Sequence, residues 1–152
     1  IEFSTYPIVA NFNIITEKEN KKVLVNETGK IVQEGIENPN LPYITVFQKN
    51  PEEAKSIDKN MLNYILESMK YFEEKFKMKV LDANYLVHAR ELHIRTERFF
   101  FIWLDIQRPY REQFIKLKKA VPRLDIYNTP LEYIDIRITG ANGKKIIFKR
   151  GK

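Results

Sequence analysis

The stretch LEYIDIRITGANGKKIIFKRGK, residues 131–152, indicates how the fold ends. Two runs that alternate apolar and polar residues flank Asn142-Gly143, the dipeptide that best tolerates the positive φ angles of a tight hairpin turn. Because side chains alternate along a strand, the three isoleucines of the first run share one face and are expected to point to a core. The second run, residues 144–150, is then expected to be an edge strand with unpaired backbone groups. Such an edge either binds a partner strand or exposes the protein to aggregation.

The N-terminal third of the chain is expected to form strands. Residues 7–15 and 21–25 are rich in β-branched and aromatic side chains, and a turn that ends at Gly29 leads to a returning arm at residues 30–33. A further extended segment at 41–46 has proline in its second position, which is tolerated at the start or the edge of a strand.

Apolar residues that recur every three or four positions predict two amphipathic helices. The first is expected to begin near Ser56 or Asp58, either of which can cap a helix, and to continue to about Phe76. The second begins at Pro109, which suits the first turn of a helix, and is expected to end near Pro122.

Between the helices, residues 80–87, 91–96 and 99–107 are expected to form a meander of three strands. Residues 99–107 are apolar on both faces, so this strand should be central in the sheet. Residues 124–127 then lead, as a short strand or loop, into the terminal hairpin. The sum is a single α+β domain over residues 1–152, with two amphipathic helices on a mainly antiparallel sheet and a C-terminal hairpin that has an open edge strand.

The composition fits a globular chain. Of its 152 residues, 43% are hydrophobic and 12% aromatic, which is too many for a disordered segment. No run approaches the roughly 20 apolar residues of a membrane helix. The absence of Cys excludes disulfides, thiolate ligands and a thiol nucleophile. The net charge of +6 fits an anionic partner or, because 20 acidic residues are interspersed, an ordinary solvated surface.

Catalytic and metal-binding patterns are sparse. The two histidines, His88 and His93, have no Cys beside them and are expected to be ordinary surface residues rather than zinc ligands. No glycine-rich phosphate-binding motif occurs. The serines do not fall in positions that suggest a hydrolase triad. We therefore expect no catalytic residue, cofactor or metal, and no enzymatic activity.

Two carboxylate pairs, Asp82 with Glu91 and Asp105 with Asp135, can come together across a sheet. Charged residues on sheet faces are more often solvated or paired with arginine than catalytic. Nucleic-acid binding is a stronger alternative, because basic residues of the second helix and the last strand are interleaved with aromatic side chains. These side chains are Tyr110, Tyr127, Tyr133 and Phe148.

The order of these elements resembles a known family. Tyr133-Ile134-Asp135-Ile136-Arg137, followed by one last basic strand, is similar to the segment near the end of the bacterial cell-division proteins FtsQ and DivIB. The run VLVNETGKIV (residues 23–32), the segment LPYI (residues 41–44) and the strand at 99–107 followed by REQFIKLKKAV resemble further parts of the same family, in the same order.

The resemblance implies a non-catalytic scaffold of the divisome, the assembly that builds the division septum. The partners that it implies are FtsB or DivIC and FtsL, division proteins of the membrane. It also implies that this chain is the extracytoplasmic β domain of a single-pass membrane protein, with the membrane helix and most of the POTRA domain upstream of Ile1.

Strand addition at the last strand suits this role, because an open edge offers backbone hydrogen bonds to an incoming strand. Asp135 and Arg137 are expected to pair or to brace neighbouring backbone, a structural role. Cations of the last strand would steer an acidic partner segment. The residues expected to bind the partner are Tyr133, Lys144, Lys145, Ile146, Ile147, Phe148, Lys149 and Arg150.

Overall fold

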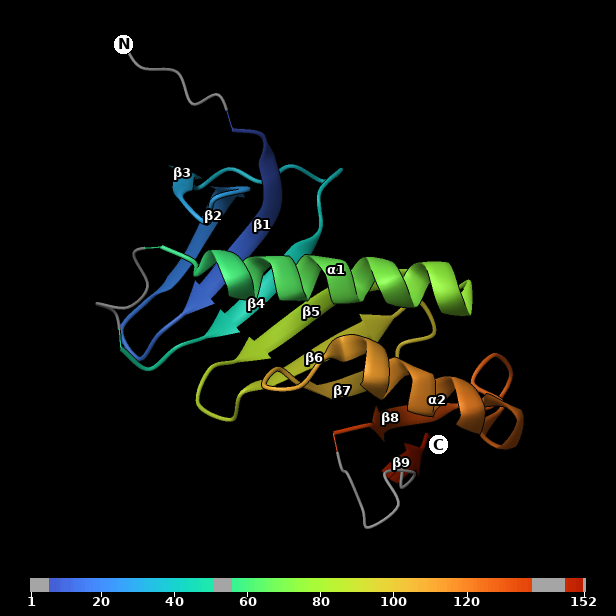
Figure 1. The fold of residues 1–152 in the computed structure, drawn as a ribbon. Helices are drawn as coiled ribbons and strands as arrows, with labels where there is room; N and C mark the ends of the chain where they lie inside the picture. Colours follow the sequence, from blue (N-terminus) through green and yellow to red (C-terminus); the bar gives the residue numbers. More distant parts are fainter. Residues whose placement is uncertain (1–5, 51–55, 138–146, 152) are drawn as a thin grey trace.

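The computed structural model describes residues 6–50, 56–137 and 147–151, which form nine strands and two helices (Figure 1). The strands before the first helix are β1 (Ile8–Ile15), β2 (Asn20–Asn26), β3 (Ile31–Glu34) and β4 (Tyr43–Phe47). Helix α1 (Lys59–Phe76) precedes β5 (Val80–Leu86), β6 (Glu91–Thr96) and β7 (Phe101–Asp105). Helix α2 (Tyr110–Leu124) precedes β8 (Leu131–Asp135) and β9 (Ile147–Arg150).

All nine strands belong to one sheet in the order β3-β2-β1-β4-β5-β6-β7-β8-β9. Five neighbouring pairs are antiparallel, whereas β1–β4, β4–β5 and β7–β8 are parallel, so the sheet is mixed but mostly antiparallel. The expected α+β class, the two N-terminal hairpins and the meander β5-β6-β7 are confirmed. Strand β7 has neighbours on both sides, as its apolar run predicted.

Local features of the sequence explain the first part of the sheet. Gly29 has φ of +89°, and a Cβ atom there would lie 1.9 Å from the carbonyl oxygen of Ile57, so only glycine fits this turn. Asn11 is buried in β1, and its amide exchanges two hydrogen bonds of 2.7 Å with the backbone of Asn38. This bond pair fixes the loop that brings β4 alongside β1 in parallel.

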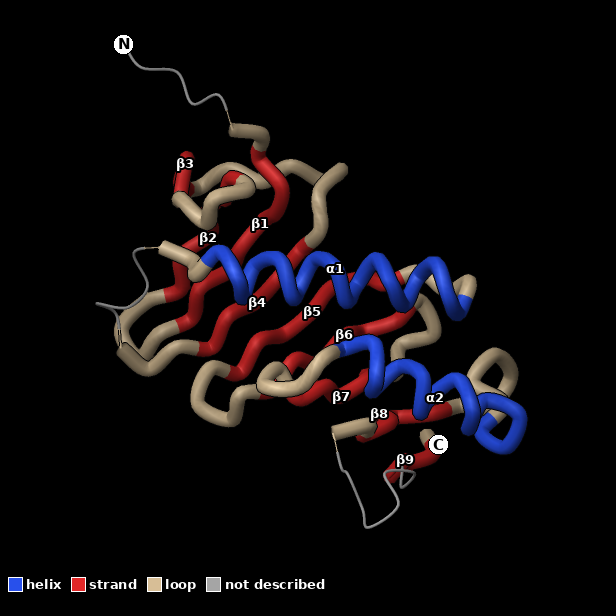
Figure 2. The backbone as a smooth tube through the Cα atoms, viewed as in Figure 1, coloured by secondary structure: helices blue, strands red, loops and turns tan. Residues whose placement is uncertain are grey.

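Both helices lie on the same face of the sheet (Figure 2). Asp58 caps α1, since its carboxylate accepts a hydrogen bond of 3.0 Å from the backbone N–H of Met61. The buried side of α1 includes Leu62, Ile65 and Phe72, and that of α2 includes Phe114 and Leu117. These side chains pack on the alternate residues of the strands that point to the same side, such as Phe12, Ile94, Ile102 and Ile134.

The second helix ends close to the expected position, since α2 continues two residues beyond Pro122, to Leu124. Proline has a helical φ angle, but inside a helix it removes one N–H donor and its ring clashes with the carbonyl four residues earlier, so helix beyond it requires compensation by packing. Burial of Leu124 and Ile126 supplies that packing. The helix ends at Asp125, which has a left-handed φ of 47° and donates its N–H to the carbonyl of Val121. Residues 126–128 form a turn rather than a strand.

A polar junction ties both helices to the end of β7. The Tyr64 hydroxyl of α1 lies 3.0 Å from the carbonyl oxygen of Asp105 and 2.7 Å from that of Arg108. Gln113 of α2 is buried, accepts from the N–H of Asp105 at 2.8 Å and donates to the Asp105 carbonyl at 2.9 Å. Among the described residues, neither helix is long and apolar enough to cross a membrane.

Candidate partner-binding edge

Strand β9 lies at the end of the sheet, beside β8 (Figure 1). The two strands are antiparallel, with Ile134 opposite Phe148 and Tyr133 opposite Lys149. This arrangement agrees with the expected edge position of the last strand. Of the residues expected to bind a partner, Ile147 to Arg150 form β9, whereas Lys144, Lys145 and Ile146 lie outside the described residues, as does the expected turn at 142–143.

All four side chains of β9 are exposed. Ile147 and Phe148 retain 38% and 40% of their full accessibility, which is high for large apolar side chains within a strand. Lys149 forms an ion pair of 3.0 Å with Glu132, and the guanidinium of Arg150 lies 5.4 Å from the centre of the Phe148 ring. The strand therefore presents two apolar side chains and two cations without a covering element in the described chain.

The backbone N–H and C=O groups of β9 point alternately toward β8 and away from it. Gly151 donates its N–H to the carbonyl of Pro130 at 3.0 Å, so it points toward β8. In an antiparallel ladder, residues that pair by hydrogen bonds alternate with residues that do not. Lys149 therefore also points toward β8, whereas the N–H and C=O groups of Phe148 and Arg150 point away from it. These outward groups are what an added strand requires.

Tyr133 belongs to a row of stacked rings on the face of the sheet that the helices leave uncovered. Its ring lies 4.0 Å from that of Trp103 with an angle of 5° between the planes. His93 stacks on the other side of Trp103, at 4.8 Å and 12°. The pairing of β6, β7 and β8 brings these residues together. His93 was expected to be an ordinary surface residue, and no role was predicted for Trp103. The contact between them depends on the register of neighbouring strands, which the spacing of residues along the sequence does not reveal.

Asp135 and Arg137 pair, as expected. Arg137 donates from Nε to Oδ1 at 2.9 Å and from Nη2 to Oδ2 at 2.7 Å, and its backbone N–H also bonds to Oδ1. Its Nη1 contacts Glu91, whose other carboxylate oxygen lies 2.8 Å from Nε2 of His93. The guanidinium of Arg137 also lies 5.3 Å from the centre of the Trp103 ring. We call these five residues the aromatic–charge cluster: Glu91, His93, Trp103, Asp135 and Arg137.

Burial and hydrogen bonding shift two pKa values in the aromatic–charge cluster. Burial tends to raise the pKa of Asp135, but the side-chain and backbone hydrogen bonds from Arg137 together hold it below the ordinary carboxyl value. Burial lowers the pKa of His93, and the hydrogen bond with Glu91 opposes this effect only in part. The lowered pKa values thus belong to two side chains that Arg137 and Glu91 connect, because Arg137 contacts both Asp135 and Glu91, and Glu91 contacts His93.

The register forms neither expected carboxylate pair. Asp82 lies opposite Arg95 and Glu91 opposite Leu86. Asp135 lies opposite Trp103 rather than Asp105. Asp82 accepts from Nε of Arg95 at 3.1 Å across β5 and β6. The prediction that sheet-face carboxylates pair with arginine is thus confirmed for Asp82 as well as for Asp135. In the described part of the chain, no group of three His, Cys, Asp or Glu side chains is placed to hold a metal ion.

The aromatic residues that suggested nucleic-acid binding are largely engaged within the protein. Tyr110 packs edge-on against Tyr64 at 5.6 Å, and the hydroxyl of Tyr127 bonds to the carbonyl of Phe76 at 2.7 Å. One face of the Tyr133 ring is covered by Trp103. Single-stranded nucleic acids are bound by rings that are free to stack on bases. Of the four expected residues, Phe148 is the exposed one, and the Arg150 guanidinium lies 5.4 Å from its ring centre.

No model of a protein family matches the chain, and no curated protein matches it. The resemblance to FtsQ and DivIB is therefore a prediction that these comparisons neither support nor contradict.

Proposed function

We propose that this protein is a non-catalytic division scaffold of the FtsQ/DivIB type, which binds a strand of a partner such as FtsB, DivIC or FtsL at the edge of β9. The observation that carries the proposal is the position of β9 at the end of the described sheet with Ile147 and Phe148 exposed. Strand alternation then directs the backbone groups of Phe148 and Arg150 away from β8. In the proposed complex the partner strand forms hydrogen bonds with Phe148 and Arg150. The full-length protein is anchored in the cell membrane, with this domain on the extracytoplasmic side.

The charge and exposure of the two sheet edges favour β9 over β3. Strand β3 contains the acidic Glu34, and the bridge between Lys30 and Ser56 covers the edge where β3 begins. The β9 edge instead carries Lys149 and Arg150 beside Ile147 and Phe148. An acidic strand with apolar residues at alternate positions complements β9, because its main chain supplies affinity and its side chains supply register.

The test is a titration of the protein with a juxtamembrane peptide of an FtsB- or DivIC-type partner and, separately, with single-stranded RNA. We expect saturable peptide binding that Phe148→Pro abolishes, because proline removes an N–H that points to the partner. The internal β8–β9 ladder should survive, since that N–H does not point to β8. Binding can be followed by calorimetry, and folding of the variant by circular dichroism.

Val32→Pro is the matched control. Val32 lies in the other edge strand, has the same 40% accessibility as Phe148, and sits at an irregularity of the β2–β3 ladder, where proline is tolerated. It should leave peptide binding unchanged. Binding to RNA without any response to the peptide contradicts the scaffold proposal and favours the basic nucleic-acid-binding alternative. Peptide binding that Phe148→Pro leaves intact contradicts strand addition at β9.

A further inference from the structure

A groove lies between α1 and α2, and we call it the interhelical groove. It encloses a cavity of about 240 Å³ whose apolar lining includes Tyr71, Phe76, Phe114 and Ile115. Phe76 and Phe114 are buried, and Tyr71 stacks on Phe114 at 5.7 Å. Because these rings are held by packing on one another, the cavity is already formed in the free protein. Of these four apolar residues, Ile115 is the exposed one, at 49%.

Three lysines form the rim of the interhelical groove. Lys118 donates from Nζ to the carbonyl of Lys75 at 2.8 Å, and this Nζ lies 5.0 Å from the centre of the Phe76 ring. Nζ of Lys75 lies 5.7 Å from the centre of the Tyr71 ring. Lys119 is the third cation that lines the groove, and none of the lining residues in the described chain is a carboxylate. An apolar cavity with a purely cationic rim complements a ligand that combines an apolar group with negative charge.

The size of the cavity favours a side chain of a bound peptide, rather than a cofactor, as its occupant. Pockets for small-molecule ligands usually measure about 300–1,000 Å³, more than this cavity provides. A groove between two helices with a single apolar recess is instead typical of peptide recognition, in which one anchor side chain enters the recess.

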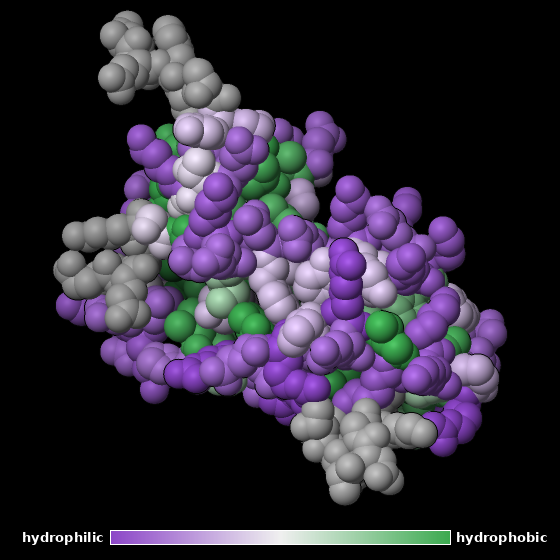
Figure 3. Space-filling view, in the orientation of Figure 1, coloured by the Kyte–Doolittle hydropathy of each residue, from purple (hydrophilic) through white to green (hydrophobic). Residues whose placement is uncertain are grey.

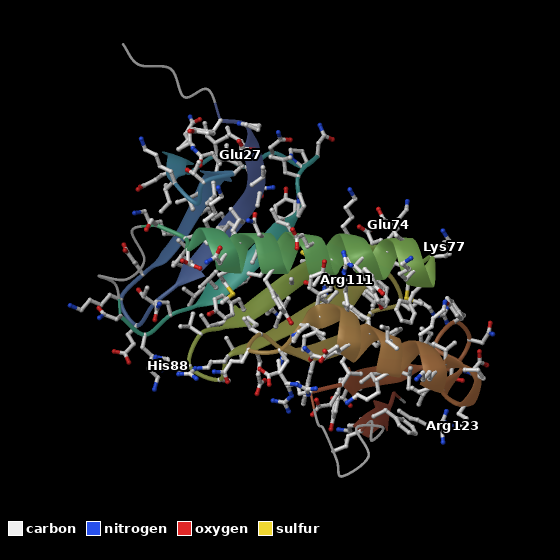
Figure 4. The ribbon with its side chains drawn as sticks, viewed as in Figure 1. Glu27, Glu74, Lys77, His88, Arg111 and Arg123 are labelled. Atoms are coloured by element: carbon white, nitrogen blue, oxygen red, sulfur yellow. The ribbon has the colours of Figure 1, made fainter. Side chains whose placement is uncertain are left out.

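The surroundings of the groove favour a peptide over an anionic membrane. The two helices also carry exposed carboxylates outside the lining, since the side chains of Glu74 of α1 and Glu112 of α2 are 60% and 65% exposed. Figure 4 labels Glu74 and Lys77 near the C-terminal end of α1 and Arg111 between the helices, so both signs of charge occur on this face. Figure 3 likewise shows a mainly hydrophilic surface with small hydrophobic areas. A membrane would meet all these charges at once, whereas a peptide can contact the lysines alone.

We infer that the interhelical groove is a second docking site, which takes an acidic peptide segment with one leucine- or phenylalanine-sized anchor. The anchor fills the cavity beside Ile115, and the peptide carboxylates contact Lys75, Lys118 and Lys119. This site lies on the helix layer rather than at the β9 edge, so it does not depend on the proposed strand addition. The protein can thus hold two acidic segments at once, of one partner or of two.

The test begins with a random dodecapeptide library selected on the full chain, with the double variant Ile115→Glu, Lys119→Glu used to remove unrelated binders. We expect the selected peptides to share one large apolar residue with Asp or Glu on either side. A selected peptide should bind the single variant Ile115→Glu about tenfold more weakly or worse, as is usual when the pocket of an anchor residue is disrupted. Amide shifts in the NMR spectrum should map to α1 and α2.

Matched substitutions separate docking from loss of fold. Ile36 has the same 49% exposure as Ile115, and Lys18 is an exposed lysine of the β1–β2 turn, so Ile36→Glu and Lys18→Glu should bind the peptide like the unaltered chain. Phe148→Pro should also bind it normally, which distinguishes failure of this site from failure of the β9 proposal. Selection of peptides without acidic residues overturns the inference. So does groove-dependent binding to phosphatidylglycerol vesicles without peptide binding, which would make the groove a membrane contact.

Discussion

Arg137 neutralises the most deeply buried carboxylate of the uncovered sheet face. The side chain of Asp135 is 5% exposed and bonds to Arg137 through both of its oxygens. We predict that Arg137→Ala lowers the free energy of unfolding by about 2–3 kcal/mol, because a buried carboxylate is left without its charged donor. Urea unfolding followed by tryptophan fluorescence measures the loss, since Trp103 lies in the same cluster.

The Asp82–Arg95 pair supplies the control for that prediction. It joins neighbouring strands on the same face, but its side chains are more exposed, at 27% and 37%. Arg95→Ala should therefore cost no more than about 1 kcal/mol, as is usual for solvated ion pairs. Equal losses in the two variants would show that burial of Asp135 does not matter.

His93 gives the fold a dependence on mildly acidic pH. Its pKa is lowered in the folded protein, chiefly by burial, so the unfolded chain takes up a proton first as the pH falls. Stability is then complete above about pH 6.5, the ordinary histidine pKa, and declines as the pH falls toward the folded pKa. The lowered pKa of Asp135 acts in the same direction only in the more acidic range below about pH 4.

We predict that His93→Gln flattens the stability profile between pH 7 and pH 5, because glutamine does not titrate. Its amide can still donate to Glu91, so the variant should remain folded. Unfolding midpoints in urea at several pH values measure the slope. The prediction fails if the variant and the unaltered chain lose stability equally across this range. Glu91, Arg137 and Asp135 are the charged groups whose fields act on His93, and the variant leaves all three in place.

At the scale of elements, the polar junction at the end of β7 holds both helices in place. Tyr64 reaches it from α1 and Gln113 from α2, and both bond to the carbonyls of Asp105 and Arg108. Burial raises the pKa of Tyr64 far above its ordinary value, so the hydroxyl keeps its proton at all physiological pH values. The junction is therefore a permanent hydrogen-bonded link between the helix layer and the sheet.

We predict that Tyr64→Phe destabilises the protein by about 1–2 kcal/mol, because the carbonyls of Asp105 and Arg108 lose the hydroxyl donor that they share in this part-buried junction, while the ring still packs. Hydrogen exchange should become faster in the first turn of α2, next to the junction. Unchanged unfolding free energy would mean that the donors of Gln113 satisfy these carbonyls without Tyr64.

At the scale of the whole molecule, β9 is peripheral to the core. All four of its side chains are exposed, whereas the buried apolar residues of the described chain end at Ile136. We predict that a chain shortened to end at Arg137 still folds, with a loss of about 1 kcal/mol or less, because surface residues contribute little to stability. Thermal unfolding and the NMR spectrum of the core amides measure this.

The same shortened chain should lose binding of the partner peptide at the β9 edge while keeping binding in the interhelical groove. Unfolding of the shortened chain would contradict the prediction and would make β9 part of the structural core. Retention of edge binding would move the docking strand away from β9.

Most of the elements could be predicted from local patterns. The sequence alone indicates three such features: the row of apolar residues along α1 that ends at Phe76, the helix cap at Asp58 and the turn at Gly29. Each depends on neighbours within a few residues. The continuation of α2 beyond Pro122 could not be predicted in this way, because burial of Leu124 against the sheet outweighs the loss at Pro122. The sequence could predict a last strand at the sheet edge with both basic and apolar side chains. It could not predict the row of stacked rings from His93 through Trp103 to Tyr133.

By itself, the sequence determined which segments become strands and helices, and which side of each is apolar, because these properties follow from chain geometry and the spacing of side chains. Only the tertiary structure decided the strand order, including the parallel neighbours β1–β4, β4–β5 and β7–β8. Strand order depends on contacts between residues far apart in the chain. Those contacts place Trp103 against Tyr133, join Arg137 to Glu91, and leave β9 at the edge.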